Sequence, residues 1–237
     1  MQQKPLTVAI MQPYFLPYIG YFQLMAAVDV FVLYDNIKYT KKGWINRNRF
    51  LKNGQDAVFS LPLKSDSDSL NIDAREVSAA FTPSELLNQW RNAYRKAPYF
   101  DEVLPVLESI VNYPQRNLFA FLHHAVCSIC TYLNITTKIV ISSEVNIDHQ
   151  FKSQAKVLAI CRALGATRYI NAIGGQALYD HATFSQHGIE LSFIHSHLTP
   201  YPQFNHAFVP WLSIIDCMMF NSKAALHSMI HDSYDLV

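Results

Sequence analysis

The fold is decided by residues 6–35, which read LTVAIMQPYFLPYIGYFQLMAAVDVFVLYD. This stretch opens with an apolar run over 6–11 and closes with another over 30–34, and each run has the length and the residue types of a buried strand. Between them, residues 19–28 repeat apolar side chains at helical spacing. Strand, loop, helix and strand in this order form a βαβ unit, so we expect a parallel sheet with a right-handed crossover.

The rest of the chain continues as a helical middle followed by a second alternation of strands and helices. The segment Thr82-Pro83-Ser84-Glu85 combines a Thr cap, a first-turn Pro and a Glu at the third position, which is typical of a helix start. Further strands are predicted over 56–62, 138–142, 168–171 and 190–194. Helices are predicted over 83–95, 99–111, 116–133, 153–164, 179–187 and 211–221. The sequence therefore predicts a single α/β domain over residues 1–237, with a mostly parallel, Rossmann-like sheet and a helical subdomain at about 83–133.

Composition and charge place the chain among folded globular proteins. Of the 237 residues, 50% are hydrophobic and 16% are charged, and the net charge is +1. These values exclude long disorder and give no overall bias toward nucleic acid or anionic membranes. The apolar run over 6–11 is too short for the core of a signal peptide, and no run is long enough to span a membrane. We therefore expect a cytoplasmic protein.

The cysteines indicate a reducing compartment and no redox or zinc site. Four cysteines are too few for a disulfide scaffold in a chain of this length. Cys127 and Cys130 form a CxxC, but they fall in a predicted helix with no second pair of ligands nearby. We interpret them as small thiols in the core.

The loop from Gln12 to Gly20 follows the first strand, and open α/β sheets bind ligands at that carboxyl edge. Backbone amides and the dipole of a helix N-terminus suit a phosphate there. Two prolines stiffen the loop, and a glycine allows a ligand or another backbone to approach closely. Aromatic residues are more frequent than a turn requires, yet for Gln12, Tyr14 and Tyr21 simple packing in the core is an equal alternative. The candidate substrate-binding residues are Gln12, Tyr14, Pro17, Gly20 and Tyr21.

The second candidate segment, residues 35–52, leaves the second predicted strand and should lie beside the first loop. Its six cations are interleaved with aromatic rings, a mixture that suits a phosphate and a stacked base or sugar. Single-stranded nucleic acid is bound by similar segments, but the net charge near zero disfavours that partner, and we expect no nucleic acid. Asp35 is a candidate general base, with a loop-capping role equally open. The candidate substrate-binding residues are Tyr39, Trp44, Asn46, Arg47, Asn48 and Arg49.

Two later segments add weaker candidates. Residues 169–175 run from a predicted strand into a glycine turn, whose amides suit a phosphate or carboxylate, although a tight turn alone also explains them. Residues 195–206 contain three histidines without a nearby carboxylate or cysteine to complete a metal-binding set, so we expect no metal. Asp216 lies in an apolar run and needs buried partners. The candidates from these segments are Asn171, Gly174, Gly175, Tyr201 and Gln203.

Several of these segments, taken in order, carry a family resemblance. They are QPYFLPYIGYF (12–22), DVFVLYDNIKYTKKGWINRNRF (29–50), INAIGG (170–175) with Tyr179, Pro200-Tyr201 with Gln203, and SIID (213–216). As an ordered set they resemble the WbqC-like family over nearly the whole chain. Members of that family are encoded in bacterial O-antigen and other surface-polysaccharide clusters. The resemblance therefore implies sugar modification, with aminoacyl (glycine) transfer onto an amino sugar as one suggestion.

The opening βαβ unit is also similar to the start of the HIGH-motif nucleotidyltransferases, which activate a phosphate or carboxylate through an adenylate. Tyr18 and Tyr21 stand about where the two histidines of that motif would fall, so the histidines that stabilise the phosphate in those enzymes are absent here. If adenylation takes place, the similarity implies that Lys41, Arg47 and Arg49 supply the positive charge. Lys41 is then a candidate catalytic residue, and ATP is the candidate cofactor.

Three functional hypotheses follow. The first is acyl or aminoacyl transfer onto an amino sugar carried on a nucleotide, with an acyl or aminoacyl donor as the second partner. The second is a non-catalytic nucleotide-sugar-binding or scaffold protein of the same pathway. The third is an ATP-dependent adenylate-forming ligase or nucleotidyltransferase. The identity of the sugar and of the donor, the use of ATP and association into a homo-oligomer stay open.

Overall fold

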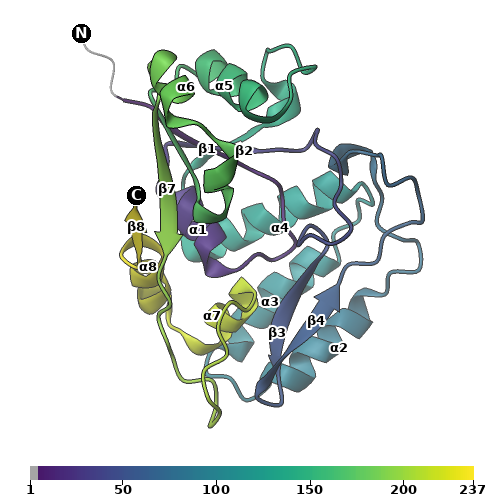
Figure 1. Ribbon diagram of the computed structural model, residues 1–237. Coiled ribbons are helices and arrows are strands. Elements are labelled where there is room, and N and C mark those ends of the chain that lie inside the picture. Colours follow the sequence, from purple (N-terminus) through teal and green to yellow (C-terminus); the bar gives the residue numbers. More distant parts are fainter. Residues whose placement is uncertain (1–4) are drawn as a thin grey trace.

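The computed structural model describes residues 5–237, and the first four residues lie outside the described part. Its centre is a six-stranded sheet in the order β5-β2-β1-β6-β7-β8 (Figure 1). All neighbouring strands are parallel except β8, which is antiparallel to β7. The predicted α/β fold with a mostly parallel sheet is therefore confirmed. The strands are β1 (Thr7–Met11), β2 (Val30–Leu33), β5 (Lys138–Ile141), β6 (Arg168–Ala172), β7 (Glu190–Ser196) and β8 (Tyr234–Leu236).

The two strands β1 and β2 are continuous apolar runs because both faces of the sheet are covered there. They pair in parallel along their length, and every residue of β2 is buried. Alternate residues belong to two separate cores. Ala9 faces the core that contains α1 (Ile19–Ala26), and Ile10 faces the core that contains α5 (Ser153–Leu164). Apolar runs without alternation are typical of parallel strands buried on both faces.

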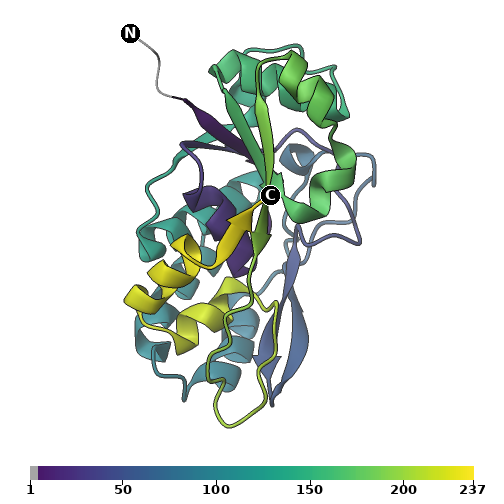
Figure 2. The ribbon, with the colours of Figure 1, turned by 60° about the vertical axis from the view of Figure 1, so that its left-hand side comes forward.

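Helices cover the sheet on both sides. The larger group packs on the α1 side, and the smaller group consists of α5 and α6. Figure 2 shows α8 in yellow and α6 in green on opposite sides of the strands. The other helices are α2 (Pro83–Tyr94), α3 (Phe100–Val111), α4 (Leu118–Leu133), α6 (His181–Gln186), α7 (Ile214–Phe220) and α8 (Lys223–His231), with short 3-10 turns η1 (Ile72–Ala74), η2 (Ser142–Glu144) and η3 (Ile173–Leu178). The helices predicted between residues 83 and 133 are present as α2, α3 and α4.

An antiparallel hairpin of β3 (Arg47–Lys52) and β4 (Gln55–Ser60) lies outside the central sheet, beside the helical layer (Figure 1). Its turn is Asn53-Gly54, with φ values of 53° and 76°, and two positive φ values are what a type I′ hairpin turn requires. The strand predicted over 56–62 is β4, but it belongs to this hairpin and not to the sheet. No strand was predicted over the preceding residues, but β3 forms there and pairs with β4.

The order in which the chain adds strands reverses between β1 and β6. From β1 the chain adds β2 and β5 on one side, and it then returns to add β6, β7 and β8 on the other. The connections that leave β1 and β6 therefore go to opposite faces of the sheet. Such a reversal opens a crevice at the carboxyl ends of the strands, where α/β proteins bind their ligands.

Candidate functional site

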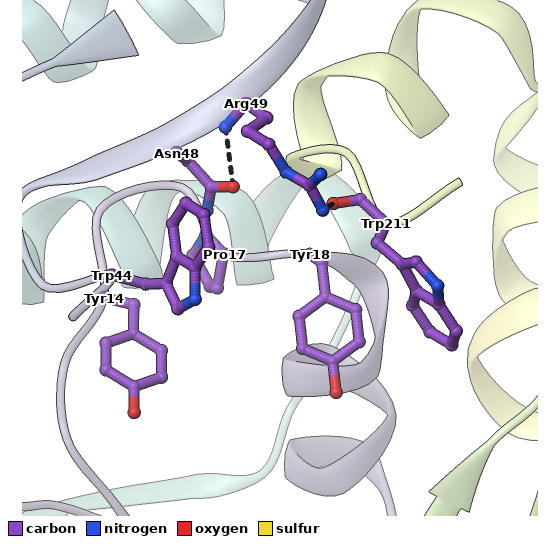
Figure 3. Close-up of a pocket in the computed structure, with 7 residues that line it drawn as sticks. All are labelled: Tyr14, Pro17, Tyr18, Trp44, Asn48, Arg49 and Trp211. Atoms are coloured by element: carbon purple, nitrogen blue, oxygen red, sulfur yellow. Dashed lines mark hydrogen bonds between the residues drawn. The ribbon is translucent and has the colours of Figure 1, made fainter. Parts of the chain in front are cut away.

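Three segments that are distant in the sequence meet at a small hollow, which we call the aromatic hollow (Figure 3). It has a volume of about 190 Å³. The predicted loop after β1 and the segment that enters β3 lie side by side here, and their role in substrate binding stays a prediction. The third segment precedes α7 and was not among the predicted site residues. The lining residues are Tyr14, Pro17, Tyr18, Trp44, Asn48, Arg49 and Trp211.

Hydrogen bonds from the second and third segments hold the first loop in shape. Leu16 has a φ of 48°, in the left-handed region that costs a non-glycine residue roughly 1–2 kcal/mol. Its carbonyl oxygen accepts hydrogen bonds from Asn48 Nδ2 at 2.9 Å and from Ser213 Oγ at 2.7 Å. Phe15 N also donates to the Ile45 oxygen at 2.9 Å. Asn48, a predicted substrate-binding residue, thus uses its side-chain amide to fix the loop.

Arg49 is the charged residue of the aromatic hollow, and Figure 3 shows it between Trp44 and Trp211. Its Nη1 lies 3.2 Å from Asp56 Oδ2, and its Nη2 donates to the Trp211 carbonyl at 3.1 Å. Its guanidinium carbon is 5.6 Å from the centre of the Trp44 ring. The two tryptophans are 43% and 44% exposed, which is high for such large apolar side chains. Two solvent-facing indoles beside a fixed cation suit a ligand.

Three other predicted residues, Tyr39, Asn46 and Arg47, stabilise the turn that carries Trp44 and do not line the aromatic hollow. Arg47, a predicted substrate-binding residue, donates to two backbone carbonyls of the preceding turn, from Nε at 3.0 Å and from Nη2 at 2.7 Å. Its guanidinium carbon lies 5.6 Å from the Trp44 ring centre. The Tyr39 hydroxyl donates to Asn46 Oδ1 at 2.7 Å. None of these three lines the aromatic hollow, and their contacts hold the turn that presents Trp44.

A second hollow lies where the strand order reverses, and we call it the sheet-edge hollow. It has a volume of about 390 Å³ and shares Tyr14 and Tyr18 with the aromatic hollow, so the two hollows are neighbours. Its described lining contains hydroxyl and amide groups but no charged side chain. Burial raises the pKa of Tyr14, Tyr18 and Tyr21 above the usual value, so these groups stay neutral hydrogen-bonding partners at physiological pH. The predicted residues in the lining are Gln12, Tyr14, Gly20, Tyr21, Asn171, Gly174 and Gly175.

Two of the predicted glycines are required by packing within the protein. A Cβ at Gly20 would lie 2.4 Å from the Tyr18 ring, and a Cβ at Gly175 would lie 2.5 Å from Asn171 Nδ2. Gly174 has open space at that position. The close approach expected at Gly20 is therefore present, but the approaching group is a protein side chain. Gly174 alone leaves its neighbourhood free for a ligand.

The two predicted catalytic residues lie outside both hollows. Asp35 is 3% exposed at the end of β2. Its Oδ1 accepts from Ser142 Oγ at 2.8 Å and from Ser143 N at 3.0 Å, and its Oδ2 accepts from Ser143 Oγ at 2.5 Å. These bonds match the loop-capping alternative. Lys41 Nζ lies 3.2 Å from Asp68 Oδ2, with both side chains well exposed. Neither residue lines either hollow, so their catalytic roles stay predictions.

Tyr201 and Gln203 belong to a buried network around Asp216, whose exposed fraction is 0%. Its carboxylate accepts hydrogen bonds from the Tyr94 hydroxyl at 2.9 Å, the Tyr201 hydroxyl at 2.7 Å and the Gln203 amide at 2.5 Å. Burial raises the pKa of Asp216, and the three hydrogen bonds oppose that shift. The network ties the loop that carries Trp211 to α7. Tyr201 and Gln203 therefore do not line the aromatic hollow, and their side chains bond to Asp216 instead.

Comparisons with known proteins agree over the same segments. A sequence model of the WbqC-like protein family matches residues 12–228, which include all three segments of the aromatic hollow. The chain is also 28% identical over 222 residues to Uncharacterized protein Rv1507c of Mycobacterium tuberculosis, a match that covers 92% of this chain and 94% of that protein. Between residues 5 and 237, no helix is long and apolar enough to cross a membrane. The same part of the chain holds no group of three or more His, Cys, Asp or Glu residues placed to bind a metal.

Proposed function

This chain belongs to the WbqC-like protein family, and we propose that it is an enzyme that transfers an acyl or aminoacyl group onto a nucleotide-linked amino sugar. The observation that carries the proposal is the aromatic hollow, where two tryptophans and two tyrosines lie around Arg49. The family resemblance supplies the pathway, which is the biosynthesis of bacterial O-antigen or another surface polysaccharide. We place the reaction in the cytoplasm.

The aromatic hollow suits one sugar ring. Flat aromatic faces pack against the apolar C–H faces of a pyranose, because such rings offer a large rigid surface. The N–H groups of Arg49 that do not bond Asp56 or the Trp211 carbonyl can donate to an oxygen of the sugar or of the phosphate attached to it. The volume of about 190 Å³ is below the roughly 300–1,000 Å³ that drug-sized ligands occupy. The hollow therefore fits a single ring, with the nucleotide carrier outside it.

The neighbouring sheet-edge hollow suits the place where the amine meets the acyl donor. It lies at the carboxyl edge, at the reversal of strand order, which is the ligand position in doubly wound proteins. The same order supports a Rossmann-like interpretation of β1, α1 and β2, of the nucleotidyltransferase type. That interpretation keeps adenylate formation with ATP as an alternative reaction. It receives less support, because of the three predicted cations only Arg49 lines a hollow.

The transfer forms an amide bond between the acyl carbon and the sugar nitrogen, breaks the bond to the donor's leaving group, and releases one proton. The described lining of the two hollows offers no Asp, Glu or His to accept that proton. Burial raises the pKa of their tyrosines, so these side chains are already protonated at neutral pH and do not accept a further proton. We propose that the departing group of the donor takes the proton, and we leave Asp35 in its capping role.

The lack of an acid or a histidine in the described lining also favours a second candidate, a non-catalytic protein that binds the nucleotide-linked sugar. Such a protein would use the aromatic hollow to hold the sugar and would present it to another enzyme of the pathway. The two candidates share the ligand, so binding alone does not separate them. They differ in whether an acylated product is formed.

The test combines binding with turnover. We expect calorimetry to detect binding of at least one member of a panel of nucleotide-linked amino sugars, and Trp44→Ala and Trp211→Ala to weaken it by about 10-fold or more. Phe204→Ala is the matched control, because Phe204 is 36% exposed and lies outside both hollows. Mass spectrometry with a panel of acyl and aminoacyl donors then looks for the amide product. Binding without product selects the second candidate, and no binding to the folded protein refutes both.

A further inference from the structure

A third hollow lies at the same carboxyl edge, and no role has been assigned to it above. It has a volume of about 740 Å³ and is lined by residues that follow β2 and β5. We call it the lysine hollow, because Lys38, Lys152 and Lys156 line it together with His149. Its described lining contains no acidic residue. It shares Tyr34 with the sheet-edge hollow, so the sheet-edge hollow has the aromatic hollow and the lysine hollow as neighbours.

Lys156 is a buried cation without a paired carboxylate. The residue is 4% exposed, and its Nζ donates to Asn36 Oδ1 at 3.0 Å and lies 5.0 Å from the centre of the Tyr34 ring. Within the described chain no ion pair joins it to an acid. Burial lowers the pKa of Lys156, and the carboxylates of Asp35 and Asp73 oppose this only in part. A buried ammonium of this kind is costly unless an anion compensates it.

The hydrogen bonds of Asn36 determine which way His149 presents its proton. The Asn36 side-chain oxygen accepts from Lys156, so its Nδ2 is the group that faces His149 Nδ1 at 3.0 Å. An amide nitrogen can only donate, and His149 Nδ1 must therefore accept. The ring proton then sits on Nε2, which is a hydrogen-bond donor. His149 thus adds a donor to the lysine hollow.

The first turn of α5 also lies in the lysine hollow. Lys152 occupies its N-cap position without a side-chain capping bond, and the first turn contains no acidic residue. The N-terminus of a helix carries a partial positive charge, so cations at its start are unfavourable for the helix itself. Lys152 and Lys156 add two cations to this end. An anion bound between them would remove both the repulsion and the unsatisfied amides.

We propose that the lysine hollow binds the phosphate groups of an activated acyl donor that contains a nucleotide. The nature of the ligand rests on the proposed acyl transfer, whereas the preference for phosphate rests on the three lysines, His149 and the start of α5. Phe151 and Leu178, which are 46% and 69% exposed, give the hollow an apolar rim for the base. The donor and the amino sugar would then reach the sheet-edge hollow from opposite sides.

The test compares the binding of ADP and of adenosine by calorimetry at low salt. We expect ADP to bind at least about 10-fold more tightly than adenosine, because charge-assisted hydrogen bonds to its phosphates are strong. Lys152→Met with Lys156→Met should remove that advantage and leave the adenosine affinity unchanged. Lys96→Met, an exposed lysine outside the hollow, should bind ADP as the wild type does. If the double variant does not fold, Lys152→Met alone should still weaken ADP binding by several-fold, because Lys152 is exposed.

The outcomes separate this site from the aromatic hollow. Equal affinities for ADP and adenosine, or an unchanged ADP affinity in the folded double variant, would overturn the donor site. Trp44→Ala and Trp211→Ala should bind ADP normally, and the lysine variants should bind the nucleotide-linked sugar normally. A protein that binds ADP but no amino sugar would refute the proposed function and keep the phosphate site. A protein that binds the sugar but not ADP would do the reverse.

Discussion

Removal of the two side chains that hold the Leu16 carbonyl tests whether this contact builds the aromatic hollow. Asn48→Ala deletes the bond to the Leu16 oxygen at 2.9 Å and the bond that Asn48 Oδ1 accepts from Arg49 N at 2.9 Å. At about 1 kcal/mol for each hydrogen bond, we expect the free energy of unfolding to fall by about 2 kcal/mol. Ser213→Ala deletes the bond of 2.7 Å to the same oxygen and a longer one of 3.3 Å from Ile215 N. We expect a loss of about 1–2 kcal/mol.

The double variant decides the question. Each single variant leaves one donor on the Leu16 carbonyl, whereas the double variant strips both side-chain donors from a buried acceptor in strained backbone. We therefore expect the combined loss to exceed the sum of the single losses by about 1 kcal/mol. Urea unfolding measures the three values, with an unchanged slope as the check on two-state behaviour. Asn48→Ala with Ser142→Ala, at a buried serine bonded to Asp35, is the additive control. Additivity in the Asn48 and Ser213 pair would refute the shared-carbonyl explanation.

Other substitutions give further expected outcomes. Gly20→Ala should lower the unfolding free energy by about 1–3 kcal/mol through overpacking against Tyr18, while Gly174→Ala, with open space, should leave thermal stability almost unchanged. Lys41→Ala should change stability by less than about 0.5 kcal/mol, because its ion pair is solvent-exposed; a selective loss of turnover would instead support the predicted catalytic role. Burial raises the pKa of Asp216 in the folded protein above its value in the unfolded chain. Between these two pKa values the folded protein binds more protons than the unfolded chain. The free energy of unfolding should therefore fall as the pH rises through this interval. Urea titrations at several pH values should show this slope in the wild type and not in Asp216→Asn.

The central sheet could be predicted because its decisive elements are determined locally. The strands β1 and β2 are apolar along their whole length, and the short helix between them has the matching spacing. The helix start at Thr82 to Glu85 is visible in the residue types, and α2 begins at Pro83. The strand β8 was not predicted, since it has three residues and becomes a strand only by pairing with β7. Its conformation depends on a contact that no local pattern reports.

The hairpin of β3 and β4 was not predicted, although the sequence contains a typical hairpin turn. Asn53-Gly54 is a strong signal for a two-residue hairpin turn, but the residues before it are rich in charge, and no strand was predicted there. In the structure, Asn48 and Phe50 face inward on β3 while Arg47 and Arg49 face the other way. Over residues 47–50 the period of two is present, with the two arginines at its outer positions, and it breaks at Leu51, which is buried.

The candidate site was predicted in part. The ends of β1 and β2 are adjacent in a parallel βαβ unit, so the segments that follow them were expected to meet. The position of the loop before α7 does not follow from that topology. The sequence predicted that the loop after β1 lies beside the segment that contains Trp44. It did not predict the position of Trp211, which lies in the loop before α7 and lines the aromatic hollow. It also gave no reason to choose between Arg47 and Arg49. That choice depends on which guanidinium finds backbone carbonyls in its own turn. Side-chain partners of this kind are known only once the backbone is folded.

The three hollows differ in how they are built, and the difference bears on how they would act. The sheet-edge and lysine hollows are lined mainly by residues at the carboxyl ends of the strands and at the start of α5. The aromatic hollow takes its indoles from the approach to the hairpin and from the loop before α7. Because Asn48 and Ser213 both bond to the Leu16 carbonyl, a change in either segment alone removes one of the two side-chain donors that hold the loop after β1. Under the proposed function, a change of sugar specificity should therefore require coordinated substitution in both segments and leave the proposed reaction at the sheet edge unchanged.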